Sequence, residues 1–275
     1  MSPDRVSFGL RKVAFVSVVM AAALLACSFS GAQPTAEIIL EPTVRPEPAF
    51  LPPTLPPEVP TSPPAATATA PEPVAPSVFR DDFDGALDPG WTWWKSDSPG
   101  WSLSHMAGWL RMNLSTGSFF GATPPANLLL RPAPSGDFEL ETWLRFSPYR
   151  NFEIAGLVVV FDDHSVLQFG RGFCEVPSAG AGCIGDGLYF DNIQNNAAVG
   201  GSFATPSYLG VDYLLRLQRQ GNSYVASFTP DNAPGGNLGT HTVEKSPVSI
   251  GLIAAQAETA GNYADFDYFQ MESGS

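Results

Sequence analysis

The chain is poor in positive charge, in histidine and in cysteine. Its 275 residues include 14 lysines and arginines against 27 aspartates and glutamates, which gives a formal net charge of −13. Nucleic acid demands a basic protein face to meet its phosphates, so this balance argues against nucleic acid as a partner. The three histidines are scattered along the chain, which gives little support to a histidine-ligated metal centre. The length allows one or two domains.

The apolar run near the start of the chain is too short for a typical transmembrane helix. It covers the fourteen residues 13–26, whereas a membrane span needs roughly 20. Three cations precede it, at Arg5, Arg11 and Lys12. A basic head followed by a short apolar core is typical of an export signal, so we expect residues 1–27 to be a signal peptide.

The signal ends in the sequence LLAC, which is similar to a bacterial lipobox. A small residue precedes Cys27 and a leucine stands three positions before it, although Leu25 is bulkier than the usual residue at its position. The resemblance implies cleavage before Cys27, lipid on its thiol and anchoring to the bacterial cell membrane. The folded part would then be extracellular or periplasmic. Ordinary signal cleavage and an uncleaved anchor are the alternatives.

Residues 28–77 lack the apolar side chains that a packed core needs. Positions 33–77 hold fourteen prolines and five glutamates, together with threonine and alanine. Proline donates no ladder hydrogen bond and favours polyproline II, and so few apolar side chains cannot offset the entropy of ordering the chain. We expect a disordered stalk that reaches on the order of 100 Å, at about 3.1 Å per residue.

From residue 78 onward, no run keeps a helical period of useful length. Turn signals such as LDPG, DSPG and PDNAPGG separate short runs rich in Val, Leu, Phe, Tyr and Trp. In the run Phe138–Phe146, Leu140 and Leu144 lie on one face of a strand, while Glu139 and Glu141 lie on the other. Many short strands between glycine and proline turns predict an all-β domain over 78–275, an antiparallel two-sheet jelly-roll sandwich.

Two cysteines remain in this domain, and they flank a glycine-rich segment. Cys174 and Cys183 stand nine positions apart around EVPSAGAG. In an exported protein, two such cysteines most simply form a disulfide. A metal pair is the competing interpretation, but the spacing does not suit a zinc knuckle and no histidine accompanies it.

Motifs at the two ends of the domain resemble the concanavalin A-like lectin/glucanase superfamily. They are FRDDFDG at 79–85, followed by LDPGW at 87–91, and ADFDYF at 264–269, the last predicted strand. The C-terminal domains of β-xylosidases and α-arabinofuranosidases are the most similar members, and AGLVVVFDDHSVLQFGR resembles their central strand pair. The resemblance covers 78–272. It implies that the first and last strands lie side by side, with Phe83 pointing inward.

The resemblance also implies a structural calcium site. In the glucanases, one carboxylate on the last strand and carbonyls near the first strand hold the ion. By position, these are the carboxylate of Asp267 and the carbonyls of Asp82 and Gly108. Calcium prefers six to eight hard oxygens, which water would complete. The alternative is that these aspartates are solvated and no metal binds.

The acid pattern of the catalytic glucanases is absent from the corresponding stretch. Those enzymes carry Glu-x-Asp-x-Glu on one strand, which places carboxylates on one face as a retaining mechanism requires. Here Glu153 is followed by Ala155 and Leu157 where acids would be needed. Glu139 and Glu141 face one way without a third acid, so we expect no enzyme.

Aromatic residues offer a candidate sugar platform. Within WTWW, Trp91 and Trp93 share one side of a strand and Trp94 opposes them, so two of the three are expected in the core. Trp143 lies on the polar face of its strand, and Tyr149 and Arg150 follow it into a loop. Exposed rings stack on sugars while polar neighbours bond the hydroxyls, so Trp143, Tyr149 and Arg150 are the candidate ligand-binding residues.

Three functions are compatible with these features. The first is a lipid-anchored, non-catalytic carbohydrate-binding module on a stalk, with a poly- or oligosaccharide as its partner. The second is a surface adhesion or structural protein that binds a protein partner. The third is a saccharide hydrolase with a carboxylate pair that departs from the glucanase pattern.

Overall fold

The computed structural model describes residues 77–95, 100–121, 123–176, 182–205, 210, 212–257 and 261–274. These residues form strands and turns, and no helix among them is long and apolar enough to cross a membrane. The signal peptide, the lipobox Cys27 and almost all of the proline-rich stalk lie outside the described residues. The predictions made for them therefore stay predictions.

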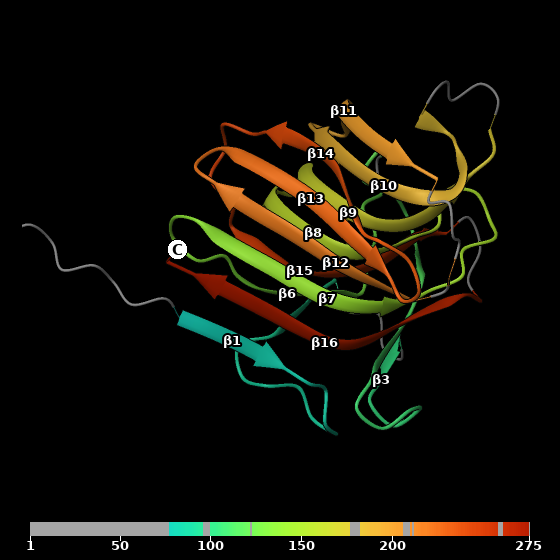
Figure 1. The fold of residues 1–275 in the computed structure, drawn as a ribbon, viewed down its shortest axis with the longest axis vertical. Coiled ribbons are helices and arrows are strands. Elements are labelled where there is room, and N and C mark those ends of the chain that lie inside the picture. The colour runs from blue at the N-terminus through green and yellow to red at the C-terminus, as the bar shows by residue number, and fades with distance from the viewer. Residues whose placement is uncertain are drawn as a thin grey trace, which may run out of the picture. The chain divides into compact units, whose positions relative to one another are not determined.

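The described residues form two eight-stranded sheets, so the predicted all-β sandwich is confirmed (Figure 1). The first sheet runs in the order β14 (Gly236–Thr242), β13 (Ser223–Pro230), β12 (Asp212–Gln220), β7 (Phe138–Arg145), β16 (Tyr263–Ser273), β4 (Leu110–Asn113) and β3 (Trp101–Ser102), with β1 (Ser77–Asp81) also paired to β16. The second sheet runs in the order β11 (Ala197–Ala204), β10 (Gly185–Gln194), β9 (Ser165–Cys174), β8 (Ile154–Asp162), β15 (Ser249–Ala257), β6 (Leu128–Pro132) and β2 (Thr92–Trp94), with β5 (Ser115–Thr116) beside β15.

The alternation predicted for Phe138–Phe146 is present in β7. Phe138, Leu140 and Leu144 are buried between the sheets, while Glu139 and Glu141 are partly exposed on the outer face. β8 differs, because eight of its nine residues are buried. An alternating strand has one solvated face, whereas β8 is covered on both faces. The second sheet therefore carries a layer of structure on its outer side as well as the core on its inner side.

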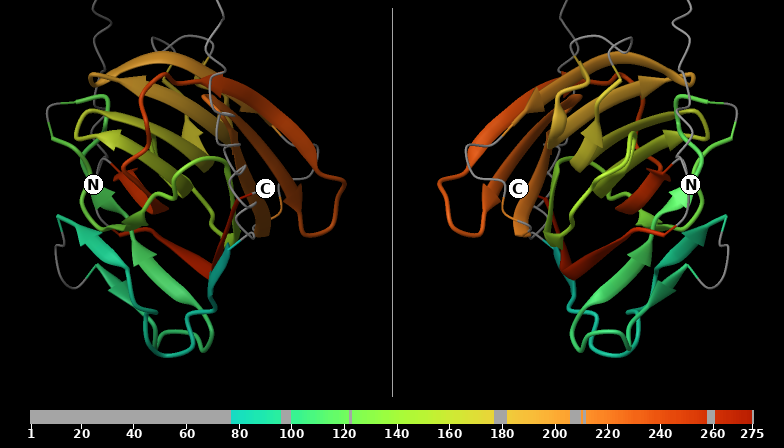
Figure 2. Two further views of the ribbon diagram at one scale, coloured as in Figure 1. Left: turned by 90° about the vertical axis from the view of Figure 1, so that its left-hand side faces the viewer. Right: turned by 90° about the vertical axis from the view of Figure 1, so that its right-hand side faces the viewer.

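The main core lies between the two sheets, which Figure 2 shows from the side. It contains large side chains from both inner faces, such as Phe169, Phe190, Tyr213, Tyr224, Phe266 and Phe269. A second, smaller cluster lies on the outer face of the second sheet and contains Phe119, Val158, Val166, Ile193 and Ile253. Side chains alternate across each strand, so the second sheet separates the two clusters.

The first and last strands are neighbours, as the resemblance implies. β1 pairs antiparallel with β16 from Ser77 opposite Ser273 to Asp81 opposite Phe269, and Phe83 is fully buried. The pairing lies further along β16 than the predicted strand 264–269. The reason is that the part of β16 up to Phe266 pairs with β4 instead.

The tryptophans divide as predicted from their alternation. Trp91 and Trp93 pack against the main core, and Trp94 packs against the outer cluster, edge-on to Phe119. The nearby acid Asp81 is buried and accepts hydrogen bonds from the backbone of Phe83 and Asp88 and from the Trp91 indole, at 2.8–2.9 Å. Asp81 therefore ties the first strand to the turn that carries the tryptophans.

Candidate functional site

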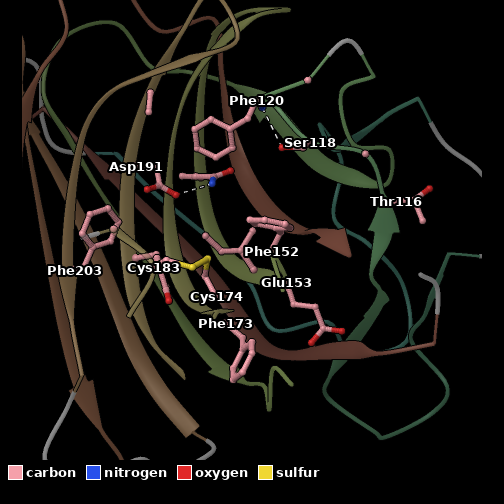
Figure 3. Close-up of a pocket in the computed structure, with 17 residues that line it drawn as sticks. Thr116, Ser118, Phe120, Phe152, Glu153, Phe173, Cys174, Cys183, Asp191 and Phe203 are labelled. Carbon is pink, nitrogen blue, oxygen red and sulfur yellow. Dashed lines mark hydrogen bonds between the residues drawn. A yellow bond between two sulfur atoms is a disulfide. The ribbon is translucent and has the colours of Figure 1, made fainter. Parts of the chain in front are cut away.

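A cavity of about 690 Å³ lies on the outer face of the second sheet (Figure 3). Its floor comes from β8 to β11, at Ile154, Gln168, Cys174, Tyr189, Asp191, Ala198 and Phe203. These positions alternate along β9 and β10 with Leu167, Phe169, Leu188 and Phe190, which belong to the main core. Residues 116–118, 120–121, 152–153 and 182–183 complete the rim together with Phe173.

Asp191 and Gln168 form a polar pair in the floor. They stand opposite each other in the β10–β9 ladder, and the Gln168 amide donates to Asp191 Oδ2 at 2.8 Å. Gln168 is buried and Asp191 is partly buried. Burial raises the pKa of Asp191 to about 6, against the opposing effect of the Gln168 hydrogen bond. The cavity thus holds a carboxylate that water solvates poorly.

Four phenylalanines line the same cavity: Phe120, Phe152, Phe173 and Phe203. In the view of Figure 3, Asp191 lies between the rings of Phe120 and Phe203. Phe120 and Phe152 stay 43% and 42% exposed although both are large and apolar. Local hydrogen bonds hold them, because Phe120 N donates to Ser118 Oγ at 3.0 Å and Phe152 N donates to the Phe173 carbonyl at 2.8 Å. Exposed rings beside a polar pair are typical of a ligand site.

The predicted disulfide is confirmed and forms part of the wall. Cys174 and Cys183 are bonded, with their Cα atoms 4.8 Å apart, and both line the cavity. Tyr189 packs beside them, and its hydroxyl donates to the Gly185 carbonyl at 2.5 Å. Burial raises the pKa of Tyr189 to about 12, so it stays a neutral donor. The disulfide and Tyr189 together fix the end of β9 against the start of β10.

The second carboxylate of the lining belongs to Glu153, and it serves a neighbouring loop. Its Oε2 accepts hydrogen bonds from the backbone of Tyr149 and Arg150 and from the Asn262 amide. In Figure 3 the Glu153 carboxylate is turned away from Asp191. The described lining therefore presents one carboxylate to the ligand space, where retaining hydrolysis needs two at about 5–5.5 Å.

The candidate ligand residues from the sequence do not line this cavity. Trp143 lies in β7, in the other sheet, and it alternates with core residues of that sheet. Tyr149 and Arg150 lie in the loop that also carries Phe152, and the Arg150 guanidinium stands 4.8 Å from the centre of the Tyr149 ring. Neither of the two is among the lining residues. Phe152 is the residue of this loop that lines the cavity, and the ligand role predicted for Trp143, Tyr149 and Arg150 stays a prediction.

Sequence reasoning missed Phe120, Gln168, Asp191 and Phe203. One signal was available: the positions of β9 and β10 that face away from the core are mostly apolar residues and glycine, and Gln168 and Asp191 interrupt them. A single polar residue on an apolar face often marks a site. The pairing of the two residues depends on the ladder register, which that signal does not contain.

Asp267, the carboxylate of the predicted calcium site, lies where the last strand changes from one neighbouring strand to another. β16 pairs with β4 up to Phe266 and with β1 from Phe269, so Asp267 falls between the two partners. Burial raises the pKa of Asp267, Arg80 and Arg145 oppose this, and Asp82 and Asp84 add to it. The described residues hold no cluster of three acidic, histidine or cysteine side chains suited to a metal. The predicted calcium site needs only one carboxylate, because its other protein ligands are backbone carbonyls. Gly108, which would supply one of these carbonyls, lies beside Asp84.

The chain is similar in sequence to one family model and in fold to several solved structures. Residues 80–172 match the family model described as the β xylosidase C-terminal concanavalin A-like domain. A search of curated proteins finds no match. Among solved structures, the Bacteroides ovatus protein of a xyloglucan PUL, GH43B, has a TM-score of 0.60 at 22% identity, over 70% of this chain and 38% of that one.

Two further structures extend the comparison. The xylan β-1,4-xylosidase of Bacillus halodurans has a TM-score of 0.58 at 21% identity, over 70% of this chain and 39% of the enzyme. Lectin I of Ulex europaeus, solved with the methyl glycoside of α-L-fucose, has a TM-score of 0.50 at 10% identity, over 72% of this chain and 97% of the lectin. This chain spans less than two fifths of the two GH43-type proteins. The described domain therefore has the concanavalin A-like fold, and its residues 80–172 match the C-terminal domain of β xylosidases.

Proposed function

We propose that the domain binds a saccharide in the cavity on the outer face of the second sheet and does not hydrolyse it. The observation that carries the proposal is a set of exposed phenylalanines around the Asp191–Gln168 pair. Aromatic rings stack on the apolar faces of sugars, and a carboxylate beside an amide exchanges hydrogen bonds with their hydroxyls. The lectin and xylosidase relatives support a saccharide over a protein partner.

The absence of catalysis is part of the same proposal. Ala155 and Leu157 stand where the glucanases carry acids, and both side chains are buried in the main core. Glu153 is engaged by backbone amides, which leaves Asp191 without a partner for a two-carboxylate mechanism. A hydrolase would need an acid from outside the described lining.

Two further parts of the proposal concern the whole chain. A lipid on Cys27 would hold the protein at the bacterial membrane, and the proline-rich segment would carry the domain away from the surface. A calcium ion held by the Asp267 carboxylate and the carbonyls of Asp82 and Gly108 would join the first and last strands. The change of partner along β16 at Asp267, from β4 to β1, supports this site.

A glycan array followed by calorimetry tests the binding proposal. The purified protein should bind at least one oligosaccharide, and Phe120→Ala should weaken that binding about tenfold or more, which corresponds to about 1.4 kcal/mol. Val248→Ala is the matched control, because Val248 is 62% exposed and outside the cavity. Binding that is unaffected by Phe120→Ala would exclude this cavity, and an array without any binder would favour a protein partner. Release of reducing sugar would indicate a hydrolase.

A further inference from the structure

The charge of the cavity restricts the ligand further than its shape does. The lining contains two acidic residues, Glu153 and Asp191, and among its described members there is no lysine, arginine or histidine. Because Glu153 is turned toward the neighbouring loop, Asp191 provides the charge at the ligand space (Figure 3). An anionic ligand such as a uronic acid would meet an uncompensated negative charge at low dielectric, which is strongly unfavourable.

Asp191 has no cation of its own in the described structure. The ion pairs formed by described residues involve other carboxylates. Its printed hydrogen bond comes from Gln168, which is neutral. A ligand that covers this carboxylate removes more of its water, so the ligand must replace that solvation. A hydroxyl does so with one dipole, whereas an ammonium group adds a full opposite charge and a stronger, charge-assisted hydrogen bond.

The aromatic rings around Asp191 also favour a positively charged ligand. The face of an aromatic ring attracts a cation placed within about 6 Å of its centre, and the attraction grows when water is excluded. Phe120, Phe152 and Phe203 line the cavity together with Asp191, and the exposed surfaces of Phe120 and Phe152 are available to a ligand. A carboxylate among aromatic rings is a combination that suits an ammonium ligand and still accepts the apolar face of a sugar.

We propose that the cavity selects a saccharide unit that carries a free amino group, and that its ammonium ion-pairs with Asp191 while the sugar ring packs on Phe120 and Phe152. This inference rests on the proposed saccharide binding and names the class of sugar. Gln168 acts as a positioning residue, because its amide holds one oxygen of Asp191 and leaves the other for the ligand. An N-acetylated sugar lacks the charge and binds more weakly.

The test compares three β-1,4-linked oligosaccharides of equal length, built from glucosamine, N-acetylglucosamine or glucose. Calorimetry with the purified protein at low salt should give the glucosamine oligomer at least about tenfold tighter binding than either neutral oligomer. Asp191→Asn should remove this preference and retain the weaker binding of the neutral oligomers. Asp163→Asn is the matched control, because it deletes the same charge from the exposed β8–β9 turn and should keep the preference.

The outcomes separate this inference from the proposed function. Equal affinity for the three oligomers would overturn the selection of an amino sugar and leave saccharide binding intact, whether or not the variants fold. A preference that Asp163→Asn removes as fully as Asp191→Asn would indicate attraction by net charge and would also overturn it. Failure of every oligomer in this set and of the glycan array would overturn both proposals.

Discussion

At the residue scale, Asp191 carries a cost to stability that its neighbours do not remove. Its pKa is raised from 3.8 to about 6 by burial. Between these values the folded state binds more protons than the unfolded state, so the free energy of unfolding falls as pH rises from about 4 to about 6. Two pKa units correspond to at most about 3 kcal/mol. A carboxylate kept at such a cost is typical of a functional site.

Asp191→Asn should therefore stabilise the protein in a pH-dependent way. At pH 8 the variant lacks the buried charge and should gain up to about 3 kcal/mol, whereas near pH 4 wild-type Asp191 is largely protonated and this gain should be absent. Urea unfolding at the two pH values measures the difference. A gain of the same size at both would show that the charge is not its cause.

Asp81, in contrast to Asp191, is expected to stabilise the fold, because its buried carboxylate accepts hydrogen bonds from three donors. It is 3% exposed and accepts three hydrogen bonds, from the backbone of Phe83 and Asp88 and from the Trp91 indole. Asp81→Ala would leave these donors without a partner, and bonds to charged groups contribute about 1.5–3 kcal/mol each. We expect a loss of more than about 3 kcal/mol in the free energy of unfolding.

Asp82→Ala is the control for that change. Asp82 is the next residue, and its side chain is 55% exposed in an ion pair with Arg80. Exposed pairs contribute about 1 kcal/mol or less. Thermal or urea unfolding of the two variants should thus give clearly different losses. Similar losses would mean that Asp81 does not organise the first turn.

At the scale of elements, the calcium proposed where β16 changes its partner from β4 to β1 is tested by its effect on stability. A ligand that binds only the folded state stabilises it by RT ln(1 + [L]/Kd), about 2.7 kcal/mol at a hundredfold excess over Kd. For a domain of this size, that amounts to several degrees in Tm. Chelator should lower the Tm and calcium should restore it, while Asp267→Asn should abolish the difference. The Asp163→Asn variant should keep the difference in Tm between chelator and calcium. A wild-type Tm that is the same with and without calcium would contradict the proposed calcium site.

The elements differ in how well the sequence predicts them. β7 has one core face and one polar face, so apolar and polar residues alternate in its sequence. The same alternation predicts that Trp93 and Trp94 pack on opposite faces of their strand. β8 is buried on both faces, and its sequence gives no period to read. The cavity was beyond prediction, because it joins Gln168 to Asp191 by ladder register and adds Phe120 from a distant loop. Local periodicity carries no information on either.

At the scale of the whole molecule, Cys27 decides where the domain works. If Cys27 carries lipid, Cys27→Ser should release the protein into the soluble extracellular or periplasmic fraction, because a polar side chain without acyl chains offers no hold on a bilayer. Fractionation followed by immunoblotting measures the change. A correctly processed Cys27→Ser protein that stays with the membrane would contradict lipidation and favour another means of retention.

The pairing of β1 with the end of β16 brings the two ends of the described domain together. Ser77 stands opposite Ser273, and their hydroxyls lie 2.6 Å apart. A domain whose entry and exit points coincide can be spliced into a surface loop of a host protein without forcing that loop apart. It can equally well be appended to either terminus of a host. The same sandwich can therefore be joined to different host proteins, after a catalytic domain in one and after a proline-rich stalk in another.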